Sequence, residues 1–209
     1  MTQAIRVELA EAHGDGWAWL ASGGTWWSAR EKRELADTAI RAMWGDGVGG
    51  AVHENLAHRA IAQIVVGNSH LTREWYDGVA AEIGALPYVE LVGIACVAAA
   101  ITSLRNSLGL PHVELPDASE EPPSRIASPA LADAELNWVP VAAPADKTAA
   151  VVQALTAVPD ANAALWRLAD VQYIPDAEMV DPRWTRGTLS RVEMELIATR
   201  VSFSRECHY

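Results

Sequence analysis

Three side chains near the end of the chain have the types and the spacing needed for thiol chemistry. Glu195 is followed by Ser202 seven positions later and by Cys207 twelve positions later. A carboxylate can relay protons to and from a cysteine, whose thiolate is the reactive form. A serine hydroxyl can donate and accept hydrogen bonds in the same relay. Glu195, Ser202 and Cys207 are therefore the candidate catalytic residues, although Cys207 taken alone also fits an inert thiol at a frayed chain end.

The other cysteine, Cys96, lies inside the apolar segment of residues 91–101. A cysteine in such a segment packs as a small hydrophobic side chain, and burial raises its pKa. We therefore expect Cys96 to belong to the core. Two cysteines do not form a disulfide framework, and neither a targeting segment nor an apolar run of membrane length is recognisable. The sequence predicts a cytoplasmic protein with reduced thiols and no membrane partner.

Two patterns that suggest metal or phosphate binding fail on their spacing. His53 and His58 are five positions apart, which separates them by roughly 140° around a helix, whereas a zinc-binding helix needs an i, i+4 pair. The glycine-rich residues 45–50 lack the lysine of a phosphate-binding loop, and no Gly-x-Ser-x-Gly sequence occurs. The sequence therefore predicts neither a metal site nor a bound cofactor.

Helices must position the candidate residues, because the start and stop signals of the chain are helical. Ser28 and Ser190 each stand three positions before a glutamate, which is the spacing of a capping box. Thr72 can cap a further helix that ends at Gly84. These signals and the apolar periodicity predict helices over residues 28–44, 52–66, 73–83, 88–108, 147–158 and 161–173, and from 190 onward. No segment alternates convincingly as a strand does, so the predicted fold class is all-α.

The overall composition excludes one class of partner. The formal net charge is −11, and the basic residues are scattered, which disfavours binding to nucleic acid. Half of the residues are hydrophobic, as in a globular protein. Nine tryptophans indicate core or interface anchors. Residues 111–140 are rich in proline and acids and have no period, which predicts a linker or an extended wrap over the surface.

Residues 189–209 resemble the segment around the active-site cysteines in the alkylhydroperoxidase D-like family, which belongs with the carboxymuconolactone decarboxylases. That family carries Glu-x11-Cys-x-x-Cys-x-x-x-His with a serine seven positions after the glutamate, and Glu195, Ser202 and Cys207 stand at those intervals. Residues 71–111 resemble the helix pair that closes a domain of this family and end, like it, on Leu-Gly-x-Pro.

The resemblance implies a helical bundle of the alkylhydroperoxidase D type with two lobes. In the first lobe, the position of a site cysteine falls near Gly45 or Asp46, and neither is a cysteine. In the second lobe the motif is cut, because its second cysteine is expected directly after Tyr209 and its histidine four positions later. The implied organisation has four parts. They are an unassigned segment (residues 1–26), a degenerate first lobe (27–110), a linker (111–140) and the first part of a second lobe (141–209).

In this family, two cysteines cycle between dithiol and disulfide while they reduce a hydroperoxide, and a carboxylate and a histidine relay protons. The resemblance therefore implies that Glu195 is the relay carboxylate, Cys207 the resolving cysteine and Ser202 a hydrogen-bonding helper. It also implies a hydroperoxide substrate, a thiol reductant and a homo-oligomer. Because the peroxidatic cysteine and the histidine are missing from the 209 residues, we expect an inactive or crippled oxidoreductase in this form.

Two other classes of function stay open. A cofactor-independent lyase of the carboxymuconolactone decarboxylase branch uses no cysteine pair, and the Glu-x11-Cys spacing argues against it. A non-catalytic helical assembly protein suits the abundant tryptophans. Consumption of a hydroperoxide, decarboxylation of a lactone acid, or neither reaction distinguishes the three classes.

Overall fold

The chain folds almost entirely into α-helices. The computed structural model describes residues 5–45, 54–67, 70–128, 130–133, 137–142 and 150–204, and 62% of the structure is helical. In this described part, the one pair of strands is β1 (Leu131–Ala132) with β2 (Val141–Ala142), which run antiparallel over two residues each. The predicted all-α fold class is therefore confirmed.

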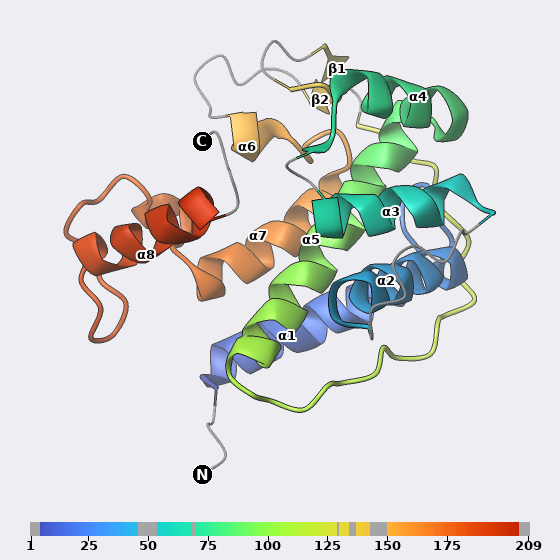
Figure 1. The fold of residues 1–209 in the computed structure, drawn as a ribbon. Helices are drawn as coiled ribbons and strands as arrows, with labels where there is room; N and C mark the ends of the chain where they lie inside the picture. Colours follow the sequence, from blue (N-terminus) through green and yellow to red (C-terminus); the bar gives the residue numbers. More distant parts are fainter. Residues whose placement is uncertain are drawn as a thin grey trace. The chain divides into compact units, whose positions relative to one another are not determined.

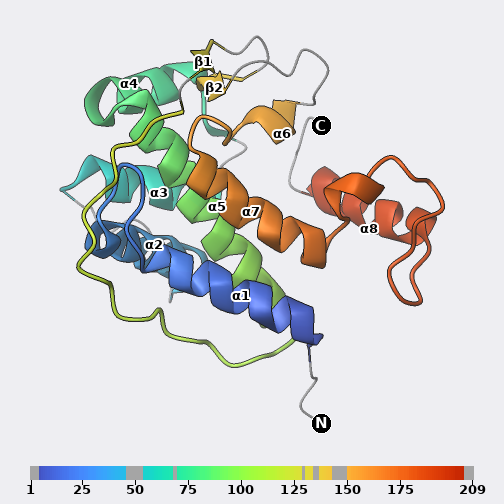
Figure 2. The same ribbon diagram turned by 180° about the vertical axis from the view of Figure 1, so that it is seen from behind.

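The long helix α5 (Ala85–Ser107) is the centre around which the preceding helices pack (Figures 1 and 2). It contacts each of the four helices before it, and α2 also contacts α3. One of the four, α1, lies within residues 1–26, for which the sequence predicts no element. The four helices are α1 (Val7–Leu20), α2 (Ala29–Trp44), α3 (Leu56–Gly67) and α4 (Arg73–Ile83).

The predicted capping signals start two of these helices. Ser28 caps α2, because its hydroxyl accepts from the Glu31 N–H at 3.4 Å while the Glu31 carboxylate accepts from the Ser28 N–H at 2.9 Å. Thr72 caps α4 by accepting from the Trp75 N–H at 3.2 Å. Gly84 joins α4 to α5 with φ +94°, a conformation that suits glycine because it has no Cβ. The start of α2 and both ends of α4 are thus as predicted.

Three other predicted helices have different boundaries. Helix α3 begins at Leu56 rather than at residue 52, because Asn55 caps it and its side chain accepts from the Ala57 N–H at 2.8 Å. The helix predicted over residues 161–173 begins two residues earlier, because Pro159 is the first residue of α7 (Pro159–Gln172), where its missing N–H costs nothing. Of the predicted helix over residues 147–158, the described part forms α6 (Ala150–Gln153) and a turn.

Helix α5 is buried along most of its length, as its apolar run predicts. Ile94 and Val97 are fully buried, and Val92 is half-buried. Burying a side chain of this size contributes about 1.5–3 kcal/mol, so α5 supplies much of the core. By length and composition α5 could also cross a membrane, a test that a buried core helix passes as well. In α5, 61% of the most apolar window is buried.

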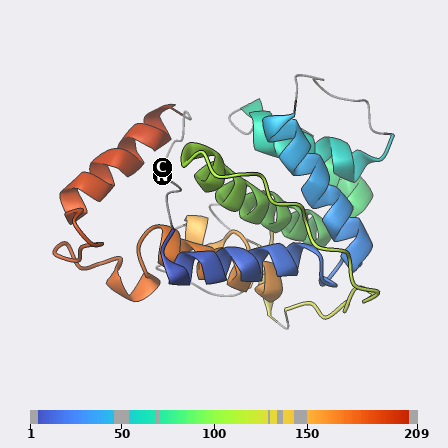
Figure 3. The same cartoon turned by 90° about the horizontal axis from the view of Figure 1, so that it is seen from below.

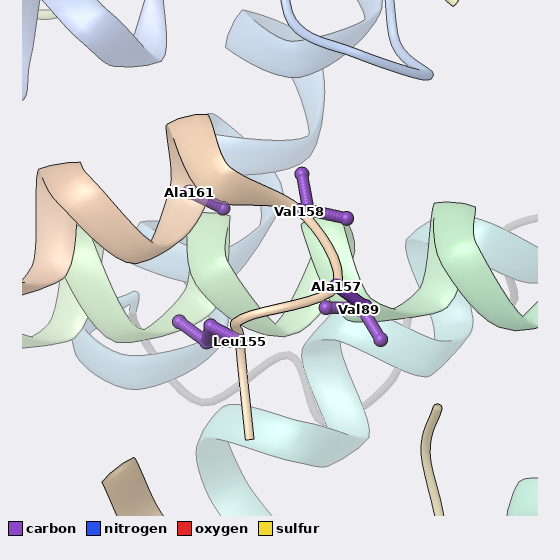
Figure 4. Packing of buried hydrophobic residues seen from close by; sticks show 5 residues of the cluster. All are labelled: Val89, Leu155, Ala157, Val158 and Ala161. Atoms are coloured by element: carbon purple, nitrogen blue, oxygen red, sulfur yellow. The ribbon is translucent and has the colours of Figure 1, made fainter. Parts of the chain in front are cut away.

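The beginning of α7 packs closely against α5 through small residues (Figure 4). A Cβ atom on Gly93 of α5 would lie 2.7 Å from the Cβ of Ala161, closer than real Cβ atoms approach each other. Glycine is therefore required at this crossing. Beside it lies a cluster of buried hydrophobic residues from α5, α7 and the turn before α7, namely Val89, Leu155, Ala157, Val158 and Ala161.

Residues 110–128 follow α5 and run as an extended segment along the helices (Figure 3). The Ser124 N–H donates to the carbonyl of Gly24 at 2.9 Å. Nearer the start of the segment, the carbonyl of Pro116 accepts a hydrogen bond of 2.7 Å from Nε of Arg33 in α2. Of the two alternatives predicted for this region, these bonds favour the surface wrap over a free linker.

The chain divides into two compact units between Leu168 and Ala169, near the end of α7. The second unit contains the 3-10 helix η2 (Asp176–Glu178) and α8 (Arg191–Ser204). The predicted capping box starts α8, since the Ser190 N–H donates to the Glu193 carboxylate at 2.8 Å and the Glu193 N–H to the Ser190 hydroxyl at 3.3 Å. The predicted linker, residues 111–140, falls within the first unit and not between the two units. The division of the chain into two family lobes stays a prediction.

Candidate functional site

The carboxylate of Glu195 is held by an arginine and a tyrosine of the second unit. Arg191 precedes Glu195 by one turn of α8 and donates from Nε to Oε1 at 2.7 Å. The i, i+4 spacing on a helix brings these two side chains together. Tyr173 donates its hydroxyl to Oε2 at 3.1 Å. The Glu195 side chain is still 45% exposed, so the carboxylate is oriented and also open to solvent.

Arg191 also fixes α8 to the loop that precedes it. Its side chain is only 14% exposed. The guanidinium donates to the carbonyls of Met179 at 2.8 Å and Asp181 at 3.2 Å. Hydrogen bonds from a charged donor are stronger than neutral ones. One side chain therefore both anchors the helix and compensates the charge of Glu195.

Tyr173 acts as a donor toward Glu195 at neutral pH. Burial raises the pKa of Tyr173, and the hydrogen bond to Glu195 and the charge of that carboxylate raise it further, while Arg191 opposes them. The phenol therefore keeps its proton. A carboxylate that is oriented in this way and has an open edge can take a proton from a thiol or hydroxyl and return it.

The structure places two of the three predicted catalytic residues. Ser202 lies seven residues after Glu195 on α8, which is close to two full turns, so the two share one helix face about 10 Å apart along the axis. Ser202 is half-buried, and among the described residues it makes no hydrogen bond to Glu195. Cys207 lies outside the residues that the structure describes.

Cys96 is half-buried, at the edge of the core rather than fully inside it. It lies in α5, and burial raises the pKa of its thiol to about 11. The thiolate is the nucleophile, so a thiol with this pKa is inert near neutrality. Cys96 therefore belongs to the packing of the first unit and not to a reactive site.

A second carboxylate, absent from the candidates drawn from the sequence, is buried in the first unit. Glu90 of α5 is fully buried and accepts from the backbone N–H groups of Thr25 at 3.1 Å and Trp26 at 2.5 Å. Burial raises the pKa of Glu90, and the bond from Trp26, the charge of Lys32 and the bond from Thr25 oppose that rise. Glu90 thus anchors the loop before α2 onto the central helix.

Lys32 of α2 is the buried cation of the same region. Its side chain is fully buried, and Nζ lies 3.7 Å from the centroid of the Trp19 ring and 3.9 Å from Oδ2 of Asp160. Within the described residues Nζ has no hydrogen-bond partner. Burial lowers the pKa of Lys32 to about 8, against the opposing charges of Asp160, Glu90 and Glu121. The side chain is enclosed, so we assign Lys32 and Glu90 to the stability of the fold.

The structure describes only one of the two histidines whose spacing was considered for metal binding. Nδ1 of His58 lies 2.7 Å from the hydroxyl of Thr38, within hydrogen-bond distance, and His53 is outside the described residues. In the part of the chain that the structure describes, no group of three or more His, Cys, Asp or Glu side chains could hold a metal ion. Of the glycine-rich residues 45–50, only Gly45 is described.

Comparison with known proteins assigns this chain to no family. No protein-family model, no curated protein and no solved structure matches the chain. The resemblance to the alkylhydroperoxidase D-like family therefore depends on the spacing of residues in this chain and enters below as a proposal.

Proposed function

We propose that the chain is a peroxidase-related protein of the alkylhydroperoxidase D-like kind, in which Glu195 relays protons for the thiol of Cys207. The observation that carries this proposal is the state of the Glu195 carboxylate. Tyr173 and Arg191 orient it, and it is still 45% exposed. A proton relay needs both properties, because the carboxylate must be aimed and must also reach the proton that it transfers.

The order of the groups along the chain supports the same proposal. Glu195 and Ser202 lie on one face of α8, which ends at Ser204, and Cys207 follows three residues later. The helix thus supplies the acid–base groups, and the segment after it supplies the sulfur.

The chemistry of a resolving cysteine is attack on an oxidised sulfur. The Cys207 thiol gives its proton to Glu195, and the thiolate attacks one sulfur of a disulfide. A new S–S bond forms, the old S–S bond breaks, and the leaving thiolate takes up a proton. With a sulfenic acid as the target, the S–O bond breaks instead and the oxygen leaves as water, using the proton that Glu195 returns.

The chain has no second reactive thiol for an internal dithiol cycle. Its two cysteines are Cys96 and Cys207, and desolvation raises the pKa of the half-buried Cys96 to about 11. A disulfide also needs its two Cα atoms within about 7 Å. We therefore propose that the 209-residue chain by itself reduces hydroperoxides slowly or not at all.

Consumption of tert-butyl hydroperoxide with dithiothreitol as the reductant tests this proposal. We expect the wild-type chain to show no rate above that of a Cys207→Ser variant. A fast rate that disappears in Cys207→Ser contradicts the proposed lack of turnover but places the chemistry at Cys207. A fast rate that survives in Cys207→Ser contradicts the site itself.

One observation favours an assembly function as a second candidate. Val192, Leu196 and Phe203 of α8 are 76%, 69% and 76% exposed. Their spacing of i, i+4 and i+11 places them within about 40° of each other around the helix. Exposed apolar stripes often mark interaction surfaces. If α8 mediates self-association, sedimentation will show an oligomer that Leu196→Glu dissociates.

A further inference from the structure

The side chain of Arg186 attaches the end of α7 to the loop that precedes α8. Its Nε donates to the carbonyl of Tyr173 at 2.9 Å, and its Nη2 donates to the carbonyl of Asp170 at 2.6 Å. The last carbonyls of a helix have no partner within the helix, and they carry a partial negative charge. A cationic side chain is therefore a favourable partner for them. Arg186 thus fixes the position at which α7 ends.

Tyr173 is the residue directly after α7, so the end of this helix determines where its side chain starts. The backbone N–H of Tyr173 donates to the carbonyl of Ala169 at 2.9 Å, and the Tyr173 carbonyl accepts from Arg186. Both backbone polar groups of Tyr173 are therefore engaged. From this fixed backbone, the phenol reaches Oε2 of Glu195 at 3.1 Å.

A short turn holds Arg186 in its own place. The Arg186 N–H donates to the carbonyl of Leu189 at 3.3 Å, and the Leu189 N–H donates to the carbonyl of Arg186 at 3.1 Å. Gly187 inside the turn has φ +59°, which glycine adopts without strain. The guanidinium carbon of Arg186 lies 4.9 Å from the centroid of the Trp184 ring, within the range of a cation–π interaction. The guanidinium is thus oriented from the loop side as well.

The same turn leads directly into α8. Leu189 precedes Ser190, the residue that caps this helix. Arg191 also attaches α8 to the loop, but the carbonyls that it contacts, within residues 178–181, lie outside α7. Arg186 therefore supplies a connection from the start of α8 to the end of α7 that Arg191 does not supply.

We propose that Arg186 is a positioning residue for the Glu195 relay, because it holds the end of α7 to the turn before α8 and thereby keeps the Tyr173 hydroxyl on the Glu195 carboxylate. Tyr173 and Glu195 are 22 positions apart, so their hydrogen bond depends on how the intervening loop is held. The bonds from Arg186 are charge-assisted, and such bonds are stronger than neutral ones. The part of Arg186 in proton transfer rests on the proposed function, whereas its effect on the Tyr173–Glu195 hydrogen bond does not.

The pKa of Tyr173, measured by NMR titration of its ring signals, tests the positioning. Burial raises this pKa, and the hydrogen bond to Glu195 raises it further. We expect Arg186→Met to lower the pKa about as far as Glu195→Gln does. The two substitutions together should lower it no further, because both remove the same bond. The loss of a positive charge alone would raise the pKa of a tyrosine, so a lower pKa reports the lost bond.

Arg183→Met is the matched control, because it removes an exposed arginine from the same loop and should leave the pKa of Tyr173 unchanged. The backbone amide signals of α8 in the same spectra check that each variant is folded. If Arg186→Met unfolds α8, Arg186→Gln replaces it, since its shorter, neutral side chain cannot keep both bonds to α7. Positioning by Arg186 is overturned if the folded variant has the Tyr173 pKa of the wild type.

The rate at which Cys207 reacts with 2,2′-dithiodipyridine at pH 7 tests the part of Arg186 in the relay. We expect Arg186→Met to slow this exchange about tenfold, because misplacing a catalytic group lowers its efficiency. The effect should be smaller than that of Glu195→Gln, since Arg191 still holds the other carboxylate oxygen. If both substitutions lower the pKa of Tyr173 and neither slows the exchange, the relay is overturned and Arg186 is only a structural anchor of Tyr173.

Discussion

The hydroxyl of Tyr173 donates a hydrogen bond of 3.1 Å to the carboxylate of Glu195. This bond links the residue that follows α7 to the middle of α8, across the loop that contains η2. Arg191 holds the other carboxylate oxygen. Helix α8, of which only Met194 is buried, thereby presents a fixed acidic group. The proposal for Cys207 depends on that group.

Replacing Glu195 by glutamine should lower the pKa of Tyr173 toward its ordinary value. The carboxylate supplies the second and third causes of the upward shift, after burial. A tyrosine whose pKa is raised on folding contributes stability that is present below about pH 10 and is lost as the pH rises through the folded pKa. Titration of the Tyr173 ring signals by NMR measures the shift. An unchanged pKa in Glu195→Gln would show that the bond does not persist in solution.

Replacing Lys32 by methionine should remove one component of the pH dependence of stability. The folded pKa of Lys32 is about 8, below its ordinary value of 10.5, so the unfolded chain binds more protons between these values and the wild type gains stability as the pH rises. Relative to Lys32→Met, the unfolding free energy of the wild type should increase by about 2–3 kcal/mol from pH 8 to pH 10.5. Urea denaturation across this range measures it, and a constant difference contradicts the buried ammonium.

Replacing Gly24 by alanine should destabilise the first unit, because the new Cβ would lie 1.7 Å from Oε1 of Glu90. The loop or the buried carboxylate must then move, and we expect a loss of about 2–4 kcal/mol. Gly78→Ala is the matched control, since Gly78 lies on α4 with nothing within 4 Å of the new Cβ. That variant should be neutral or more stable by up to about 1 kcal/mol. Equal effects of the two substitutions in thermal unfolding would contradict the tight packing at Glu90.

The two cysteines should differ strongly in their reaction with iodoacetamide at pH 8. A thiol with a pKa of about 11 is about 0.1% ionised at that pH, compared with about a quarter for an ordinary cysteine. Cys207 should therefore be modified at least about 100-fold faster than Cys96. Mass spectrometry of the modified peptides measures both rates, and urea should abolish the difference. Similar rates in the folded chain would show that Cys96 is accessible.

The local signals of the sequence predicted much of the helical fold. Ser28 and Thr72 start helices as expected, since an N-cap depends on residues only a few positions apart. Helix α1 was not predicted, because Gly14 and Gly16 weaken its helical pattern. Gly16 lies on a closely packed face, since a Cβ there would lie 2.8 Å from the end of the Ile101 side chain.

The sequence could not predict that the buried side chains of Glu90 and Lys32 lie in the same region of the core. Glu90 interrupts an apolar helix and Lys32 falls on the buried face of α2, so each was visible as an exception to its pattern. Their neighbourhood depends on how α2, α5 and α7 pack, and no local spacing encodes contacts over such separations. The same holds for Tyr173, which reaches Glu195 from 22 positions away.

The central claim is that Glu195 relays the proton of the Cys207 thiol. It is tested most directly by the rate at which Cys207 reacts with 2,2′-dithiodipyridine at pH 7, which mass spectrometry measures. Glu193→Gln is the matched control, because Gln at that position keeps the capping box of α8. If Glu195 relays the thiol proton, Glu195→Gln should slow the exchange about 100-fold, the usual scale of a general acid–base contribution, while Glu193→Gln leaves it unchanged. Equal rates in wild type, Glu195→Gln and Glu193→Gln would contradict the assignment.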